Sequence, residues 1–147
     1  MFVLLESPLT YSCTNFNQRK RYLDELRATV SQTTTGRPLD GIICPVAPFP
    51  APPHGQYVYA GYTCVWNVLD LPSVAIPVTM VDQNIDVPDQ DYKPRSETDR
   101  IVYTMYDGPG KFQDAPVGIQ VVGKRWREEE CLGLARVVDD ALKAKAL

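Results

Sequence analysis

The spacing of apolar residues along the chain predicts three helices. Over residues 15–30, apolar positions recur every three or four residues among charged ones, which predicts an amphipathic helix. Residues 60–69 place aromatic and aliphatic side chains on one face and predict a second, short and mostly buried helix. A third helix is predicted over residues 127–144, because acidic residues open it, lysines close it and an apolar stripe runs along it.

Short apolar runs bounded by glycine and proline predict the strands. Residues 39–46, 73–78 and 117–123 have this pattern, which is typical of strands buried on both faces. The first of them is expected to be a central, parallel-type strand, and Pro77 predicts that the second ends or bulges there. Residues 1–5 are a further strand candidate. Strands that alternate with helices favour an α/β fold.

Two segments lack such periodicity. Five prolines between Pro45 and Pro53 remove backbone donors and predict an irregular surface or cleft loop. Residues 82–114 are charged and contain prolines, so we expect a long irregular excursion with little structure of its own. A connection of this length is usually functional, packed against another part, or mobile. The length of 147 residues allows one domain at most, here a single partial domain over residues 1–147.

Charge and composition narrow the class of protein. The 15 Lys and Arg against 18 Asp and Glu give a net charge of −3, which argues against nucleic acid as a partner. No stretch approaches the roughly 20 apolar residues of a membrane span, and the first residues do not form a secretory signal, so no membrane partner is expected. The cysteines at 13, 44, 64 and 131 are too dispersed for a zinc site. We interpret them as free thiols in a reducing, cytoplasmic setting, with two disulfides as the alternative.

The chain offers little for nucleophilic catalysis. None of its five serines lies in a Gly-x-Ser-x-Gly turn or beside a second serine in a glycine-rich turn. Cys44 and His54 form a possible thiol and base, but a small buried cysteine and an exposed loop histidine are the simpler interpretation. Phosphate-binding glycine motifs are absent from the sequence, so we expect no cofactor.

Two further groups of residues have a functional and a structural interpretation. The acidic residues Asp82, Asp86, Asp89 and Asp91 do not have the spacing of a calcium loop, so a solvated loop is favoured and no metal site is expected. Tyr62 and Trp66 share one face of the predicted short helix. They either line a ligand cavity or belong to the core.

Three segments in this order resemble the C-terminal part of amidase-signature enzymes. They are residues 40–48 (DGIICPVAP), 62–74 (YTCVWNVLDLPSV) and 114–123 (DAPVGIQVVG). The charged stretch over residues 91–107 is most similar to the fungal acetamidase and general amidase branch. The resemblance extends from about residue 15 to the end of the sequence.

The resemblance implies a chemistry and also a gap. Members of the family hydrolyse carboxylic amides with a Ser–cis-Ser–Lys triad, without metal or cofactor, on a mixed sheet wrapped by helices. In full-length members the triad precedes the region that this chain resembles, and no residue here matches a triad position, so no catalytic residue is assigned. The proline-rich turn after Val46 and the helix with Tyr62, Trp66 and Asn67 look like segments that approach the substrate cavity.

These expectations lead to two hypotheses. In the first, the chain is a partial mixed sheet flanked by helices, inactive by itself, whose partners are a small-molecule amide and the missing N-terminal half. Without that half, sheet edges and one sheet face lack cover. In the second, the chain is a non-catalytic binding or assembly module that pairs with another chain, or with itself, through the uncovered sheet face.

Overall fold

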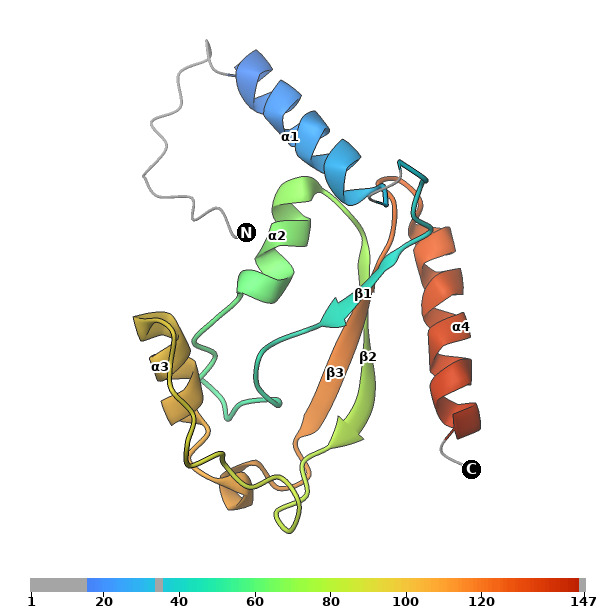
Figure 1. The fold of residues 1–147 in the computed structure, drawn as a ribbon. Helices are drawn as coiled ribbons and strands as arrows, with labels where there is room; N and C mark the ends of the chain where they lie inside the picture. The colour runs from blue at the N-terminus through green and yellow to red at the C-terminus, as the bar shows by residue number, and fades with distance from the viewer. Residues whose placement is uncertain (1–15, 34–35, 146–147) are drawn as a thin grey trace. The chain divides into compact units, whose positions relative to one another are not determined.

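The computed structural model describes residues 16–33 and 36–145, and its contacts divide the chain after Pro38 into two compact units (Figure 1). Each unit is described by itself. The first contains helix α1 (Phe16–Val30), which confirms the helix predicted over residues 15–30. The strand candidate over residues 1–5 lies outside the described residues. The prediction of a single domain over the whole chain stays a prediction.

The second unit is built on an antiparallel sheet with the strand order β1-β3-β2 (Figure 1). Its strands are β1 (Ile42–Pro45), β2 (Ser73–Met80) and β3 (Pro116–Val122), so all three strand predictions in this part of the chain are confirmed. The parallel central strand expected over residues 39–46 is wrong, because β1 pairs antiparallel with β3 alone. As an edge strand it leaves Ile43 58% exposed. An apolar run in the sequence is buried only where the tertiary fold places another strand on each side of it.

Pro77 has the effect on β2 that the sequence predicts. The register of β2 against β3 shifts between Pro77 and Thr79, and the ladder then continues to Met80 opposite Pro116. Proline cannot donate a ladder hydrogen bond, so it is tolerated at an irregular position of an edge strand. The prediction that the strand ends or bulges at this residue is confirmed.

Helix α4 (Glu128–Lys145) covers one face of the sheet (Figure 1). The buried core between them contains Ile76, Val121 and Ala135, with flanking side chains that are partly buried: Val74, Ile119, Leu134 and Val138. The helix approaches the end of β3 so closely that a Cβ added to Gly123 would lie 2.6 Å from the Cβ of Cys131. The predicted helix over residues 127–144 and the α/β class are therefore confirmed.

Helix α2 (Gly61–Leu69) lies on the opposite side of the sheet from α4 (Figure 1). Asp70 adopts a left-handed conformation (φ 56°) and donates its N–H to the carbonyl of Asn67, while Leu71 donates to Trp66. This arrangement satisfies the last carbonyls of the helix and ends it, as Pro72 follows at once. The short helix predicted over residues 60–69 is confirmed.

The excursion segment, defined as residues 82–114, is more ordered than its composition indicates. It contains helix α3 (Glu97–Met105) and the 3-10 helix η2 (Pro109–Phe112), so the expectation of little structure of its own is wrong. Ser96 caps α3, because its hydroxyl accepts the N–H of Asp99 at 3.1 Å. Glu97 and Asp99 also place negative charge in the first turn, which stabilises the helix dipole.

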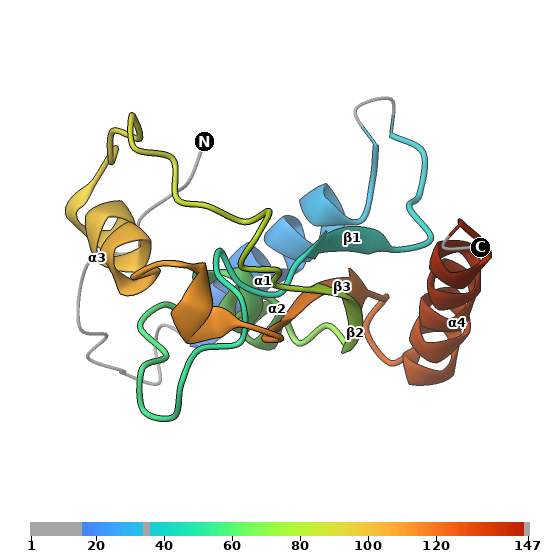
Figure 2. The same ribbon diagram turned by 90° about the horizontal axis from the view of Figure 1, so that it is seen from below.

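The base of the excursion segment is closed by backbone hydrogen bonds. Val81 donates to Ala115 at 3.0 Å, and Asp114 donates to Val81 at 3.1 Å. Phe112 is only 1% exposed, so it anchors the segment by burial. Figure 2 shows the segment extending away from the sheet on the side opposite to α4. Among the described helices, none is long and apolar enough to cross a membrane.

Candidate functional site

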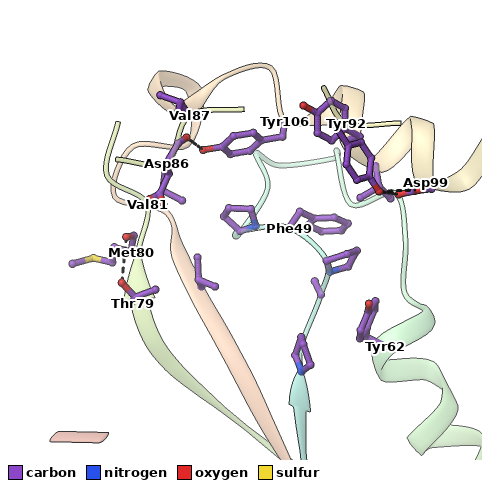
Figure 3. A pocket seen from close by; sticks show the side chains of 17 residues that line it. Phe49, Tyr62, Thr79, Met80, Val81, Asp86, Val87, Tyr92, Asp99 and Tyr106 are labelled. Carbon is purple, nitrogen blue, oxygen red and sulfur yellow. Dashed lines mark hydrogen bonds between the residues drawn. The ribbon is translucent and has the colours of Figure 1, made fainter. Parts of the chain in front are cut away.

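A cavity of about 800 Å³ opens between the proline-rich turn, the end of β2 and the excursion segment (Figure 3). Aromatic and aliphatic side chains form most of its wall. The lining residues used below are Phe49, Tyr62, Met80, Asp86, Tyr92, Asp99, Tyr103 and Tyr106.

The proline-rich turn is fixed to the sheet by its backbone. Val46 donates its N–H to the carbonyl of Gly118 at 3.2 Å, and Ala51 donates to Pro116 at 3.0 Å. Between these two attachments Phe49 is buried, and its ring meets Tyr57 edge to face at 5.4 Å between centroids. The prolines limit the remaining backbone freedom, so the turn forms a rigid wall for the cavity.

The wall near α2 depends on Gln120, the one polar residue that is buried among those that the structure describes. Its amide nitrogen Nε2 donates to the carbonyls of Pro45 and Tyr62, both at 2.8 Å, and its Oε1 accepts the hydroxyl of Ser73 at 2.8 Å. One side chain of β3 therefore connects the end of β1, the start of α2 and the start of β2. It sets the position of Tyr62 relative to the proline-rich turn.

Tyrosines of the excursion segment form the facing wall. Tyr92 and Tyr103 stack with centroids 4.4 Å apart, and Tyr106 packs on Phe112 at 5.0 Å. The Tyr103 hydroxyl donates to the carbonyl of Asp89. The Tyr106 hydroxyl donates to the carbonyl of Asp86 at 2.9 Å (Figure 3). These bonds orient the rings, because each hydroxyl is tied to the backbone of the same segment.

Two carboxylates supply the charge of the cavity. Asp99 accepts the backbone N–H of Arg95 and the hydroxyl of Tyr92, each at 2.8 Å, and these bonds lower the pKa of its carboxyl group. The same bond raises the pKa of Tyr92, because the phenol proton is held by the carboxylate. Burial, followed by the charge of Asp86, raises the pKa of Tyr106. At neutral pH the Asp99 carboxylate is thus charged, and the phenols of Tyr92 and Tyr106 are neutral.

The residues that the sequence assigns to a substrate cavity are only partly brought together. Tyr62 lines the cavity, whereas Trp66 and Asn67 are not among its lining residues. The indole Nε1 of Trp66 is buried and has no hydrogen-bond partner among the described residues. A role of the three residues against a substrate stays a prediction.

The alternative of a catalytic thiol gains no support from the geometry. Cys44 lies half-buried on β1 and His54 lies exposed in the proline-rich loop, and no hydrogen bond joins them in the described part of the chain. Burial raises the pKa of the Cys44 thiol. A thiol with a raised pKa is a poor nucleophile at neutral pH.

Other candidate groups have structural roles. Cys44, Cys64 and Cys131 are free thiols, while Cys13 lies outside the described residues. Ser73 donates to Gln120, and Ser96 caps α3. Within residues 16–33 and 36–145, no three His, Cys, Asp or Glu side chains are grouped so as to hold a metal ion.

The sequence patterns did not predict the tyrosine wall, which is formed by Tyr92, Tyr103 and Tyr106. The excursion segment was judged from its charged and proline-containing composition, without a search for a helix in it. One local signal was available: Ser96 followed three residues later by Asp99 is the pattern of a capped helix start. A helix begun there places Val102 and Tyr103 four and three residues before Tyr106, on the same face as it.

Comparison with known proteins gives the family. A family model described as Amidase matches residues 4–132. The acetamidase of Aspergillus oryzae is 44% identical over 121 residues, which cover 82% of this chain and 22% of that protein. The acetamidase of Emericella nidulans is 40% identical over 127 residues, covering 86% of this chain and 23% of that protein.

A solved structure gives the same result for the fold. A fatty acid amide hydrolase is similar with a TM-score of 0.77 and 29% sequence identity, over 90% of this chain and 24% of that one. The fold expected from the C-terminal part of amidase-signature enzymes is confirmed, as is the similarity to fungal acetamidases. This chain, which spans less than a quarter of the length of these three relatives, belongs to the amidase family.

Proposed function

We propose that the chain is the C-terminal part of an amide-hydrolysing enzyme and is inactive by itself. In this proposal it supplies one wall of the substrate cavity, through the proline-rich turn, Tyr62 and the excursion segment. The nucleophile and its base belong to the part of the relatives that this chain does not span. The substrate is a small carboxylic amide.

One observation carries this proposal: the structure has an ordered cavity wall, while Ser73 and Ser96 lie outside its lining and are hydrogen-bonded to other groups. Ser73 lies 2.8 Å from Gln120, and Ser96 accepts a helix N–H. A nucleophilic serine needs a base within hydrogen-bond reach, and neither residue has one among these partners. The thiol of Cys44 has a raised pKa and no base. The cavity therefore offers binding groups without a reacting group.

The test is an assay of the purified chain on acetamide and benzamide, with a full-length fungal acetamidase as the positive control. We expect no ammonia release above that of buffer from the chain alone. Turnover that disappears in Ser31→Ala, Ser73→Ala, Ser96→Ala or Cys44→Ser would place a nucleophile in this chain and refute the proposal. A circular dichroism spectrum equal to that of the wild type verifies that each variant is folded.

A second candidate function is an assembly module, and exposed apolar residues favour it. Val65 and Val68 on α2 are 40% and 49% exposed, and Ile43 on the edge strand β1 is more exposed still. Apolar side chains in such positions are typical of surfaces that another chain covers.

Sedimentation equilibrium separates this candidate from the first. An assembly module self-associates at micromolar concentration, and Val68→Lys then restores the monomer while Thr98→Lys, on exposed α3, does not. A monomeric chain at 100 µM would contradict self-association.

A further inference from the structure

The cavity has aromatic walls and a net negative charge. Among the described residues that line it, Asp86 and Asp99 are the only charged ones, and none is a Lys, Arg or His. Apart from Thr79, the other described lining residues are aromatic, aliphatic or proline. Asp86 is exposed and Asp99 half-buried, so water screens part of their charge, but with no positive side chain in the described lining the potential favours a cation.

The tyrosines offer ring surfaces and not free hydrogen-bond donors. The hydroxyls of Tyr92, Tyr103 and Tyr106 donate to the Asp99 carboxylate and to the carbonyls of Asp89 and Asp86, respectively. A ligand group that needs strong donors therefore gains little at this wall. A group that binds through the negative face of an aromatic ring gains more, and methylated ammonium ions bind in this way.

Backbone donors hold the two carboxylates in place. Asp82 donates its N–H to Asp86 at 2.8 Å, and Arg95 donates its N–H to Asp99 at 2.8 Å. Figure 3 shows Asp86 and Asp99 on opposite sides of Phe49, so their charges flank the cavity. The guanidinium of Arg95 attracts Asp99 but is not part of the lining.

We propose that this cavity binds a methylated or quaternary ammonium group carried by a small organic molecule. The ring of Tyr106 and the outer face of the stacked Tyr92–Tyr103 pair contact the alkylated nitrogen, and Asp86 and Asp99 supply the opposing charge. As a statement about binding, this requires no amide cleavage. If the bound molecule is also the substrate, the proposal rests on the proposed function. The enzyme would then prefer amides whose acyl or amine part carries such a cation.

The first experiment uses the unaltered chain and two probes of equal shape. Choline carries a trimethylammonium group, and 3,3-dimethylbutan-1-ol replaces its nitrogen by carbon. Ligand-observed NMR titration measures the Kd of both. We expect choline to bind about tenfold more tightly, since both the rings and the carboxylates act on the charge alone. Its advantage falls as the salt concentration rises. Equal affinity, tighter binding of the alcohol, or no binding of either probe overturns the proposal.

Variants then locate the site. Asp86→Asn and Asp99→Asn each reduce the preference for choline about threefold, because one of two flanking charges is lost. Asp107→Asn is the matched control, because it removes the same charge from the same segment outside the cavity lining and leaves the preference unchanged. Tyr106→Phe keeps the ring but loses the hydroxyl bond that orients it, so it weakens choline binding less than Tyr106→Leu, which removes the ring. An equal loss in the Asp107 control, or no loss in the Leu variant, contradicts the assignment.

Binding is read without turnover, so the two proposals fail separately. Absence of a choline preference overturns the ammonium site and leaves the C-terminal amidase proposal in place. Ammonia release by the chain alone overturns the amidase proposal and does not change the measured Kd values.

Discussion

Gln120 gives the sharpest prediction, because one buried amide connects three elements. It is 2% exposed, and each of its three hydrogen bonds is 2.8 Å long. Gln120→Leu removes all three and leaves the volume nearly unchanged, so little is added by a cavity. At about 1 kcal/mol for each bond, the free energy of unfolding falls by about 3 kcal/mol.

Urea denaturation followed by tryptophan fluorescence measures this loss. For an m-value of about 1.5 kcal/mol/M, the midpoint falls by about 2 M. Ser73→Ala breaks one of the three bonds and costs about 1 kcal/mol. Because Ser73 and Gln120 are directly bonded, the double variant is no less stable than Gln120→Leu alone.

A charged replacement adds a pH signature. Gln120→Glu places a carboxylate against the carbonyls of Pro45 and Tyr62, which raises the pKa of the new group in the folded state. Its stability relative to Gln120→Leu is therefore greatest below the unfolded pKa of about 4.3 and falls as the pH rises. A loss below about 1 kcal/mol in Gln120→Leu, or additive effects of the Ser73 and Gln120 changes, would refute the role of the amide.

Three further predictions concern other parts of the fold. Gly123→Ala lowers the urea midpoint, because its Cβ would lie 2.6 Å from the Cβ of Cys131 on α4. Gly133→Ala raises the free energy of unfolding by about 0.5–1 kcal/mol, because nothing lies within 4 Å of the added carbon. Equal effects of the two changes would contradict the close packing of α4. Ser96→Ala removes the cap of α3 and costs about 1 kcal/mol, which hydrogen exchange of the α3 amides detects as faster exchange; unchanged protection would refute the cap. Iodoacetamide modifies the exposed Cys64 faster than Cys44, whose raised pKa delays thiolate formation to higher pH, and mass spectrometry of labelled peptides at pH 7 and 9 checks the order.

Helices α2 and α4 and the three strands of the second unit follow from local sequence. Apolar spacing in 60–69 and 127–144 matches the period of a helix, and the short apolar runs match strands, because these periods arise from backbone geometry within one element. The irregularity of β2 at Pro77 is also a local effect. Proline has no N–H to donate to a neighbouring strand, wherever the strand lies in the sheet. The family resemblance was likewise present in the order of three segments.

Tertiary structure alone decided the pairing of β1, the depth of Gln120 and the tyrosine wall. An apolar run looks the same in an edge strand and in a central strand, because strand neighbours come from distant parts of the chain. The sequence marks Gln120 as polar, yet packing buries it and brings its partners Pro45 and Tyr62 from 75 and 58 residues away. The cavity arises where three such distant segments meet, and no local pattern encodes that meeting.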